Sequence, residues 1–208
     1  MIHTTAIPSH CLDMMPQYAG SVGHPVIRES PPGLPPPICS NRPVEHLGSA
    51  HDVLHETETD LYLARLPNLA AWPELRGDPT WREVVEDSDA GFALFVAGDW
   101  TRQTPSIQSF ATYCFEHGVF WVSTWGPKCE QAHDLFDWPD IEAHGANESV
   151  VMTTWHDAEP LHVAMTLFFS AFPDEGKNGG PARIALTFGL PDWSEAVRRI
   201  METELKTG

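Results

Sequence analysis

The stretch Phe120–Asp134, FWVSTWGPKCEQAHD, joins an apolar strand pattern to a helical pattern through Trp-Gly-Pro. Three other apolar runs are followed by similar combinations of turn residues and aromatic or polar residues: Gly98-Asp99-Trp100, Trp155-His156-Asp157 and Phe188-Gly189-Leu190-Pro191. If the strands are parallel, these endings lie together at the carboxyl edge of one sheet, which is where ligands bind in open α/β folds. The stretch therefore predicts a fold and the place of a site.

A strand followed by an amphipathic helix occurs four times after residue 90. The predicted strands are Phe92–Ala97, Val119–Thr124, Ser149–Thr154 and Arg183–Phe188. Helices are predicted to begin near Thr104, Pro127, Pro160 and Asp192, with a bend in the second at Trp138-Pro139. This repetition predicts a three-layer α/β domain, in which a mostly parallel sheet of four or more strands has helices on both faces, as in flavodoxin-like and Rossmann-like folds.

The N-terminal quarter of the chain has a different composition. Residues 1–50 contain nine of the nineteen prolines and show no sustained apolar periodicity, so we expect an extended or disordered Pro-rich arm followed by a single α/β domain over residues 51–208. Residues 51–78 have a mixed pattern that predicts a short strand or helical turn over the sheet. Asp78-Pro79 then has the residue types of a helix N-terminus.

The chain is strongly acidic, with a formal net charge of −17. Residues 1–50 contribute −1 (two basic, three acidic) and residues 51–208 contribute −16 (10 basic, 26 acidic). Such a charge repels phosphate backbones and argues against binding to nucleic acid or an anionic membrane. It fits either a well-solvated surface or a surface for a basic partner.

Several features predict a cytoplasmic location. No apolar run approaches the roughly 20 residues of a membrane-spanning helix. The N-terminus has no signal-peptide pattern, and the four cysteines form no C-x-x-C pair, so reduced thiols are expected.

Cys129 and His133 lie one helical turn apart and are candidates for chemistry. With His156 and Asp99 they could hold zinc or iron, and Cys129 near a helix N-terminus could instead be a thiol nucleophile with a histidine base. The third interpretation is that these side chains simply pack in the core, as buried cysteines commonly do.

The carboxyl edge also carries candidate ligand-binding residues, which combine a carboxylate, an imidazole and large aromatic rings: Asp99, Trp100, Trp125, Gly126, Trp155 and His156. If exposed together, the tryptophans would line an aromatic pocket for a flat ligand, whereas buried tryptophans would close the core. No glycine-rich phosphate loop follows the first predicted strand of these repeats, so a nucleotide cofactor is not expected.

A family resemblance is carried by four segments: Thr124-Trp125-Gly126-Pro127-x-Cys129, His133-Asp134, Met152-Thr153-Thr154-Trp155-His156 and Ala171-Phe172-Pro173. Over roughly residues 55–175, the chain resembles an uncharacterised family of small bacterial α/β proteins, known as a domain of unknown function. The resemblance implies one recurring module and no particular activity.

Two functions are therefore expected. The first is a non-enzymatic binding or accessory module that uses the Trp-lined carboxyl edge or the acidic surface to bind a protein partner or a small molecule. The second is a small enzyme that uses Cys129, His133, His156 and Asp99. An enzyme requires these groups to converge, whereas a binding module does not. The oligomeric state stays open.

Overall fold

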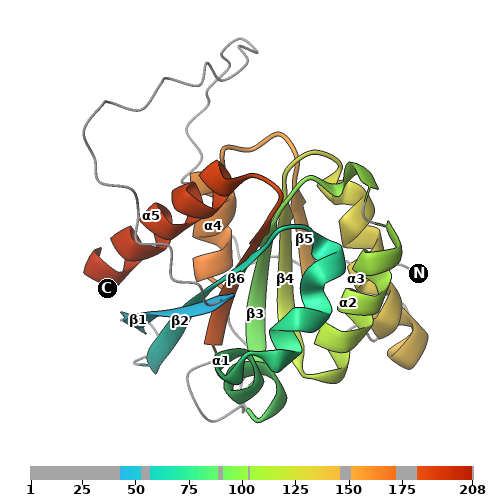
Figure 1. Ribbon diagram of the computed structural model, residues 1–208, viewed down its shortest axis with the longest axis horizontal. Coiled ribbons are helices and arrows are strands. Elements are labelled where there is room, and N and C mark those ends of the chain that lie inside the picture. The colour runs from blue at the N-terminus through green and yellow to red at the C-terminus, as the bar shows by residue number, and fades with distance from the viewer. Residues whose placement is uncertain are drawn as a thin grey trace, which may run out of the picture. The chain divides into compact units, whose positions relative to one another are not determined.

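A six-stranded sheet runs through the computed structural model, which describes residues 43–52, 57–88, 91–102, 104–145, 151–171 and 182–207 (Figure 1). The strands are β1 (Val44–Asp52), β2 (Thr57–Leu66), β3 (Phe92–Ala97), β4 (Val119–Trp125), β5 (Met152–His156) and β6 (Ala182–Phe188). Their order in the sheet is β1-β2-β6-β3-β4-β5. β1 pairs antiparallel with β2, and all other neighbours are parallel.

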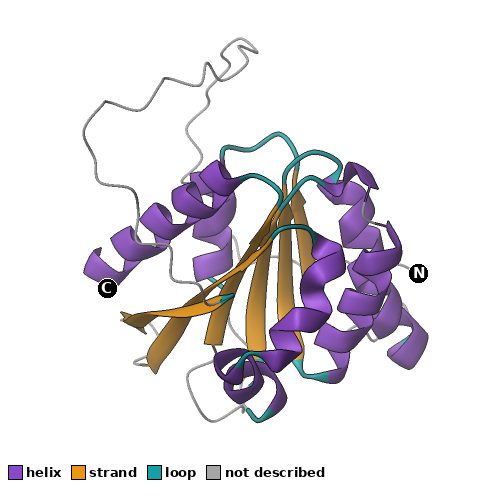
Figure 2. Ribbon diagram, in the orientation of Figure 1, coloured by secondary structure: helices purple, strands orange, loops and turns teal. Residues whose placement is uncertain are grey.

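Helical segments flank the sheet on both faces (Figure 2). They are η2 (Leu69–Gly77), α1 (Pro79–Trp81), η3 (Arg82–Glu86), η4 (Trp100–Arg102), α2 (Thr104–Glu116), α3 (Cys129–His144), α4 (Leu161–Phe169) and α5 (Pro191–Thr207). The predicted three-layer α/β class is therefore confirmed. Among the described residues, no helix combines the length and the apolar character needed to cross a bilayer.

Two hydrophobic clusters fill the spaces between the layers. On one face, side chains of η2, α1, η3, α2 and α3 pack against the sheet, and on the other face those of α4 and α5 do. β3 is buried at every position, in agreement with its unbroken apolar sequence. A fully buried Phe or Leu contributes about 1.5–3 kcal/mol through burial, so these central strands carry much of the stability.

The place of β6 is a notable feature of the topology. In the common doubly wound orders the last strand lies at an edge of the sheet, whereas here β6 lies between β2 and β3. The chain leaves β3 toward α2 on one face of the sheet, and it leaves β6 toward α5 on the other face. The topological switch point of the sheet therefore lies between these two neighbouring strands.

The predicted bounds of the third strand need correction. β5 begins at Met152, not Ser149, and extends to His156. α3 continues through Pro139 to His144, and both Pro139 and Asp140 are buried. The carboxylate of Asp140 accepts a hydrogen bond from the backbone N–H of Val151 at 2.8 Å, which ties α3 to the entry of β5.

Residues 44–50, which the Pro-rich arm was predicted to include, belong to β1, and residues 57–66 form a ten-residue strand instead of a short covering segment. The remainder of the predicted arm, residues 1–42, lies outside the described residues. β1 has little strand character of its own, because Gly48 interrupts it at a register shift. Pairing with β2 and packing of α5 stabilise it, and Leu205 of α5 lies over Gly48.

An ion-pair cluster also ties β1 to the domain. Glu45 accepts a hydrogen bond from Arg65 of β2 at 3.1 Å and another from Arg198 of α5. Burial by itself would raise the pKa of the Glu45 carboxyl, but the two guanidinium groups outweigh burial and lower this pKa.

Candidate functional site

The four strand endings meet at one edge of the sheet, as expected for parallel strands (Figure 2). The loops after β3 and β4 are joined by backbone hydrogen bonds. Gly98 N–H donates to Trp125 O at 3.1 Å, and Trp100 N–H donates to Pro127 O at 3.2 Å. The loops therefore form a connected rim along the carboxyl edge.

Phe188 fills the switch point between β3 and β6. Its ring lies so close to Gly98 that a Cβ built on this glycine would be 2.0 Å from the nearest ring atom. Trp100 packs edge-on against the same ring, with 4.9 Å between centroids, and both side chains are buried. The crevice where this fold class usually binds its ligand is thus occupied by the protein's own aromatic side chains.

The tryptophans of the edge differ in their roles. Trp100 is buried and donates its indole N–H to Trp125 O at 3.1 Å. Trp125 is half-buried, donates to Glu159 O at 3.0 Å and packs edge-on against Trp193. Of the three tryptophans predicted to bind a ligand, only Trp155 is well exposed, at 46%. These side chains close the edge of the core, and they do not line a common aromatic pocket.

Gly126 and Asp99 have structural explanations. Gly126 has φ +111°, and a Cβ there would lie 2.3 Å from the carbonyl oxygen of Gly98, so only glycine fits this loop contact. The exposed carboxylate of Asp99 accepts hydrogen bonds from the backbone N–H and the hydroxyl of Thr101 at 3.1 and 2.8 Å. Asp99 therefore organises the turn that leads into η4.

Cys129 begins α3 and is fully buried. Burial raises the pKa of its thiol, and hydrogen bonds from the His156 backbone and the Thr124 side chain offset this rise only in part. A protonated, inaccessible thiol is a poor nucleophile.

His133 and His156 contact neighbouring threonines of β5 that point to opposite faces of the sheet. His133 Nε2 lies 3.0 Å from Thr153 Oγ1, and His156 Nε2 lies 3.1 Å from Thr154 Oγ1. Since successive strand residues alternate in direction, the two imidazoles are on different sides of β5. Within the described ranges, no three His, Cys, Asp or Glu side chains are grouped so that they could hold a metal ion. The predicted zinc or iron ligands are therefore not brought together.

A row of polar side chains that the sequence prediction missed crosses β4 and β5. Trp121 Nε1 donates to Ser123 Oγ at 2.8 Å, Ser123 Oγ lies 2.9 Å from Thr154 Oγ1, and the row continues to His156. His156 is buried, and this burial lowers the pKa of its imidazole against the opposing effect of Glu159. The alternation of Trp121 and Ser123 is the signal in the sequence, but it does not reveal the partners.

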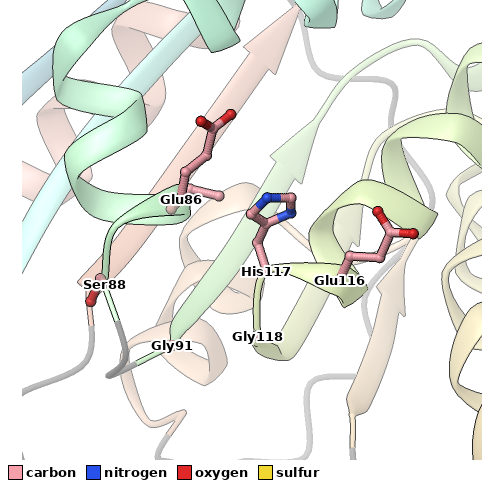
Figure 3. A pocket seen from close by; sticks show the side chains of 7 residues that line it. Glu86, Ser88, Gly91, Glu116, His117 and Gly118 are labelled. Carbon is pink, nitrogen blue, oxygen red and sulfur yellow. The ribbon is translucent and has the colours of Figure 1, made fainter.

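An open pocket of about 290 Å³ lies at the opposite, amino edge, beside the starts of β3 and β4 (Figure 3). Its polar lining includes Glu86, Glu116 and His117. Glu86 accepts a hydrogen bond from Tyr113 at 2.9 Å and pairs with Arg76 at 3.4 Å. Burial would raise the pKa of the Glu86 carboxyl, but these partners lower this pKa overall. The Glu86 carboxylate thus links η3 to η2 through Arg76 and to α2 through Tyr113.

The face formed by α3, β5 and the loop after β5, which we call the α3–β5 face, combines acidic and apolar side chains. Residues 129–159 contain eight Asp or Glu residues and neither Lys nor Arg, and six of these carboxylates lie outside the core among the described residues: Glu130, Asp134, Asp137, Glu142, Asp157 and Glu159. Two large apolar side chains are exposed on α3 and β5, Trp138 at 54% and Trp155 at 46%, and Met152, which is 55% exposed, points to the opposite side of β5. His133 packs against Trp155, with ring centroids 4.5 Å apart.

A family described as a domain of unknown function, DUF7684, matches residues 71–204. The chain belongs to this family. The DUF7684 match includes β3 to β6, α2 to α4 and most of α5, and it begins after β1 and β2. It starts and ends later than the resemblance noted from the sequence. Neither a search of curated proteins nor a search of solved structures found a match.

Proposed function

We propose that the chain is a non-enzymatic binding module whose α3–β5 face binds a basic segment of a partner protein. The observation that carries this proposal is that α3 and β5 combine carboxylates, with no Lys or Arg within residues 129–159, and the exposed tryptophans Trp138 and Trp155. Carboxylates attract Lys and Arg and accelerate encounter, and an indole face binds a guanidinium through a cation–π contact. We place this action in the cytoplasm, where the buried thiols of Cys114 and Cys129 stay reduced.

The arrangement of the candidate catalytic groups favours binding over the small-enzyme alternative. Cys129 is inaccessible, the two histidines point to opposite faces of β5, and Asp99 organises a turn. The switch point of the sheet, where a small substrate would be expected, is filled by Phe188. Exposed apolar side chains rimmed by carboxylates are a feature of interaction surfaces.

Binding of a short fluorescent peptide of alternating arginine and glycine tests the proposal by anisotropy at low and high salt. Replacing Glu130 and Asp134 with Gln and Asn should weaken binding about 2- to 30-fold, because each exposed charge pair contributes roughly 0.2–1 kcal/mol. Trp155→Ala should weaken it further. The control pair is Glu74→Gln and Leu190→Ala, which removes an exposed charge and an exposed apolar side chain from other elements. Equal losses in both sets would refute the proposal.

A further inference from the structure

The two edge strands of the sheet are protected to different degrees. β1 has a register shift between His46 and Gly48 and is tied to the domain through the ion pairs of Glu45. α5 packs against it, and Leu205 contacts the position of the shift. Bulges, charges and covering helices are the devices by which proteins prevent an edge strand from pairing with another chain.

β5 has few of these devices. Within the described residues it pairs on one side only, with β4, and its pairing shows no register shift. Its sequence, MTTWH, contains no Lys, Asp, Glu or Pro. Among the features that protect edge strands, β5 has only its short length. Its exposed apolar side chains, Met152 and Trp155, favour pairing with another segment.

The two sides of β5 differ in chemistry. Thr153 and Trp155 face α3, and both of these side chains contact His133. The hydroxyl of Thr153 also donates to the carboxylate of Asp137. Because side chains alternate along a strand, Met152 faces the other way, beside its cross-strand neighbour Trp121. A strand added to β5 would thus have an acidic environment on the side of α3. On the other side it would meet an apolar contact at Met152 and Trp121, followed by the polar row of Ser123, Thr154 and His156.

We propose that the partner segment binds as an extended strand added to the edge of β5 that has no strand partner among the described residues, with basic residues toward α3 alternating with apolar residues toward Met152. This inference rests on the proposed function and specifies its binding mode and the sequence pattern of the partner. Main-chain hydrogen bonds would supply affinity, and the alternate side chains would supply specificity. Asp134 and Asp137 both contact His133, which packs against Trp155 of β5, so their carboxylates lie on this side of the strand.

Charge decides between a basic partner and a second copy of the chain. Two copies paired through β5 would bring two acidic α3 helices together, each in a chain of net charge −17. Like charges across an interface are unfavourable, whereas a basic segment neutralises them.

The test uses a short peptide of alternating lysine and valine together with two N-methylated forms of it. One form is methylated at the lysine amides and the other at the valine amides, so that each loses the backbone donors of one strand edge and keeps every side chain. Strand addition predicts that one form loses at least about tenfold in affinity, because several backbone hydrogen bonds are lost, whereas the other binds nearly as the parent does. Amide exchange within 152–156 should slow when the parent peptide is bound.

A matched pair of variants adds a second readout. Met152→Lys places a charge on the edge strand and should weaken binding of the parent peptide at least tenfold. Leu190→Lys makes the same charge change at a side chain that is 52% exposed, in the loop between β6 and α5. This control should change the affinity less than about threefold.

The other outcomes separate this inference from the function on which it rests. If both methylated peptides bind as the parent does and Asp134→Asn still weakens binding, the face binds through side chains alone, and strand addition is wrong although the proposed function stands. If no basic peptide binds at low salt, both are wrong. Concentration-dependent dimerisation that slows β5 exchange without peptide would assign the edge to a second copy and overturn the inference.

Discussion

Gly98→Ala should destabilise the domain by inserting a methyl group into the aromatic contact that closes the switch point. The new Cβ would lie 2.0, 2.2 and 2.4 Å from three atoms of the Phe188 ring, whereas carbon atoms pack best at about 3.5–4.0 Å. The ring cannot move freely because Phe188 is buried and packs against Trp100. Gly98 has no positive φ, so the backbone accepts alanine and the ring alone opposes it.

Overpacking of this kind costs about 1–3 kcal/mol, and the short distances place Gly98→Ala toward the upper end. Urea denaturation followed by fluorescence measures the cost. With an m value of roughly 2 kcal/mol/M, the midpoint should fall by about 0.5–1.5 M. The control is Gly77→Ala, because no atom lies within 4 Å of a Cβ at Gly77. That variant should be neutral or more stable by about 0.4–1 kcal/mol.

A double-mutant cycle with Phe188→Leu identifies the ring as the cause. Once the ring is gone, Gly98→Ala should cost at least about 1 kcal/mol less than in the wild type. Additive effects, within roughly 0.3–0.5 kcal/mol, would show that the Gly98–Phe188 contact does not close the switch point as described.

Three further predictions concern a helix cap, a thiol and an ion pair. Asp78→Ala should cost about 1 kcal/mol in urea denaturation, because Asp78 Oδ1 accepts from the N–H groups of Thr80 and Trp81; an unchanged midpoint would contradict this role. In a chain with Cys11→Ser and Cys39→Ser, the buried cysteines should react with a thiol reagent only on unfolding, and rapid reaction of native Cys129 would contradict its burial. Glu45→Gln should cost about 1 kcal/mol at neutral pH. The lowered pKa of Glu45 makes this stabilisation complete above its unfolded value of 4.5, so the difference from the wild type should vanish as the pH falls through the folded pKa, and a constant difference would argue against the ion pairs.

Local sequence patterns predicted the elements that are buried on both sides. The strand Phe92–Ala97 has the predicted bounds, because six consecutive apolar residues fit a strand covered on both faces. The cap at Asp78 was also predicted, since it depends on contacts within three residues. Such features need no distant partner.

The hairpin of β1 and β2 and the insertion of β6 were not predicted. Thr187 of β6 donates to Ala64 O of β2 across 123 residues of sequence, a contact that no local window contains. β1 holds its place through pairing with β2 and through Arg198 of α5. Both depend on contacts between distant segments.

The candidate site shows the same division between local and distant effects. The sequence by itself determined that four strand endings would share the carboxyl edge, because strand–helix repeats favour parallel strands. Only the tertiary structure decided that Phe188 closes this edge, that Cys129 is buried and that His133 and His156 point to opposite faces. The physical reason is that residue type sets what a side chain can do, whereas burial and direction depend on which distant segments pack around it.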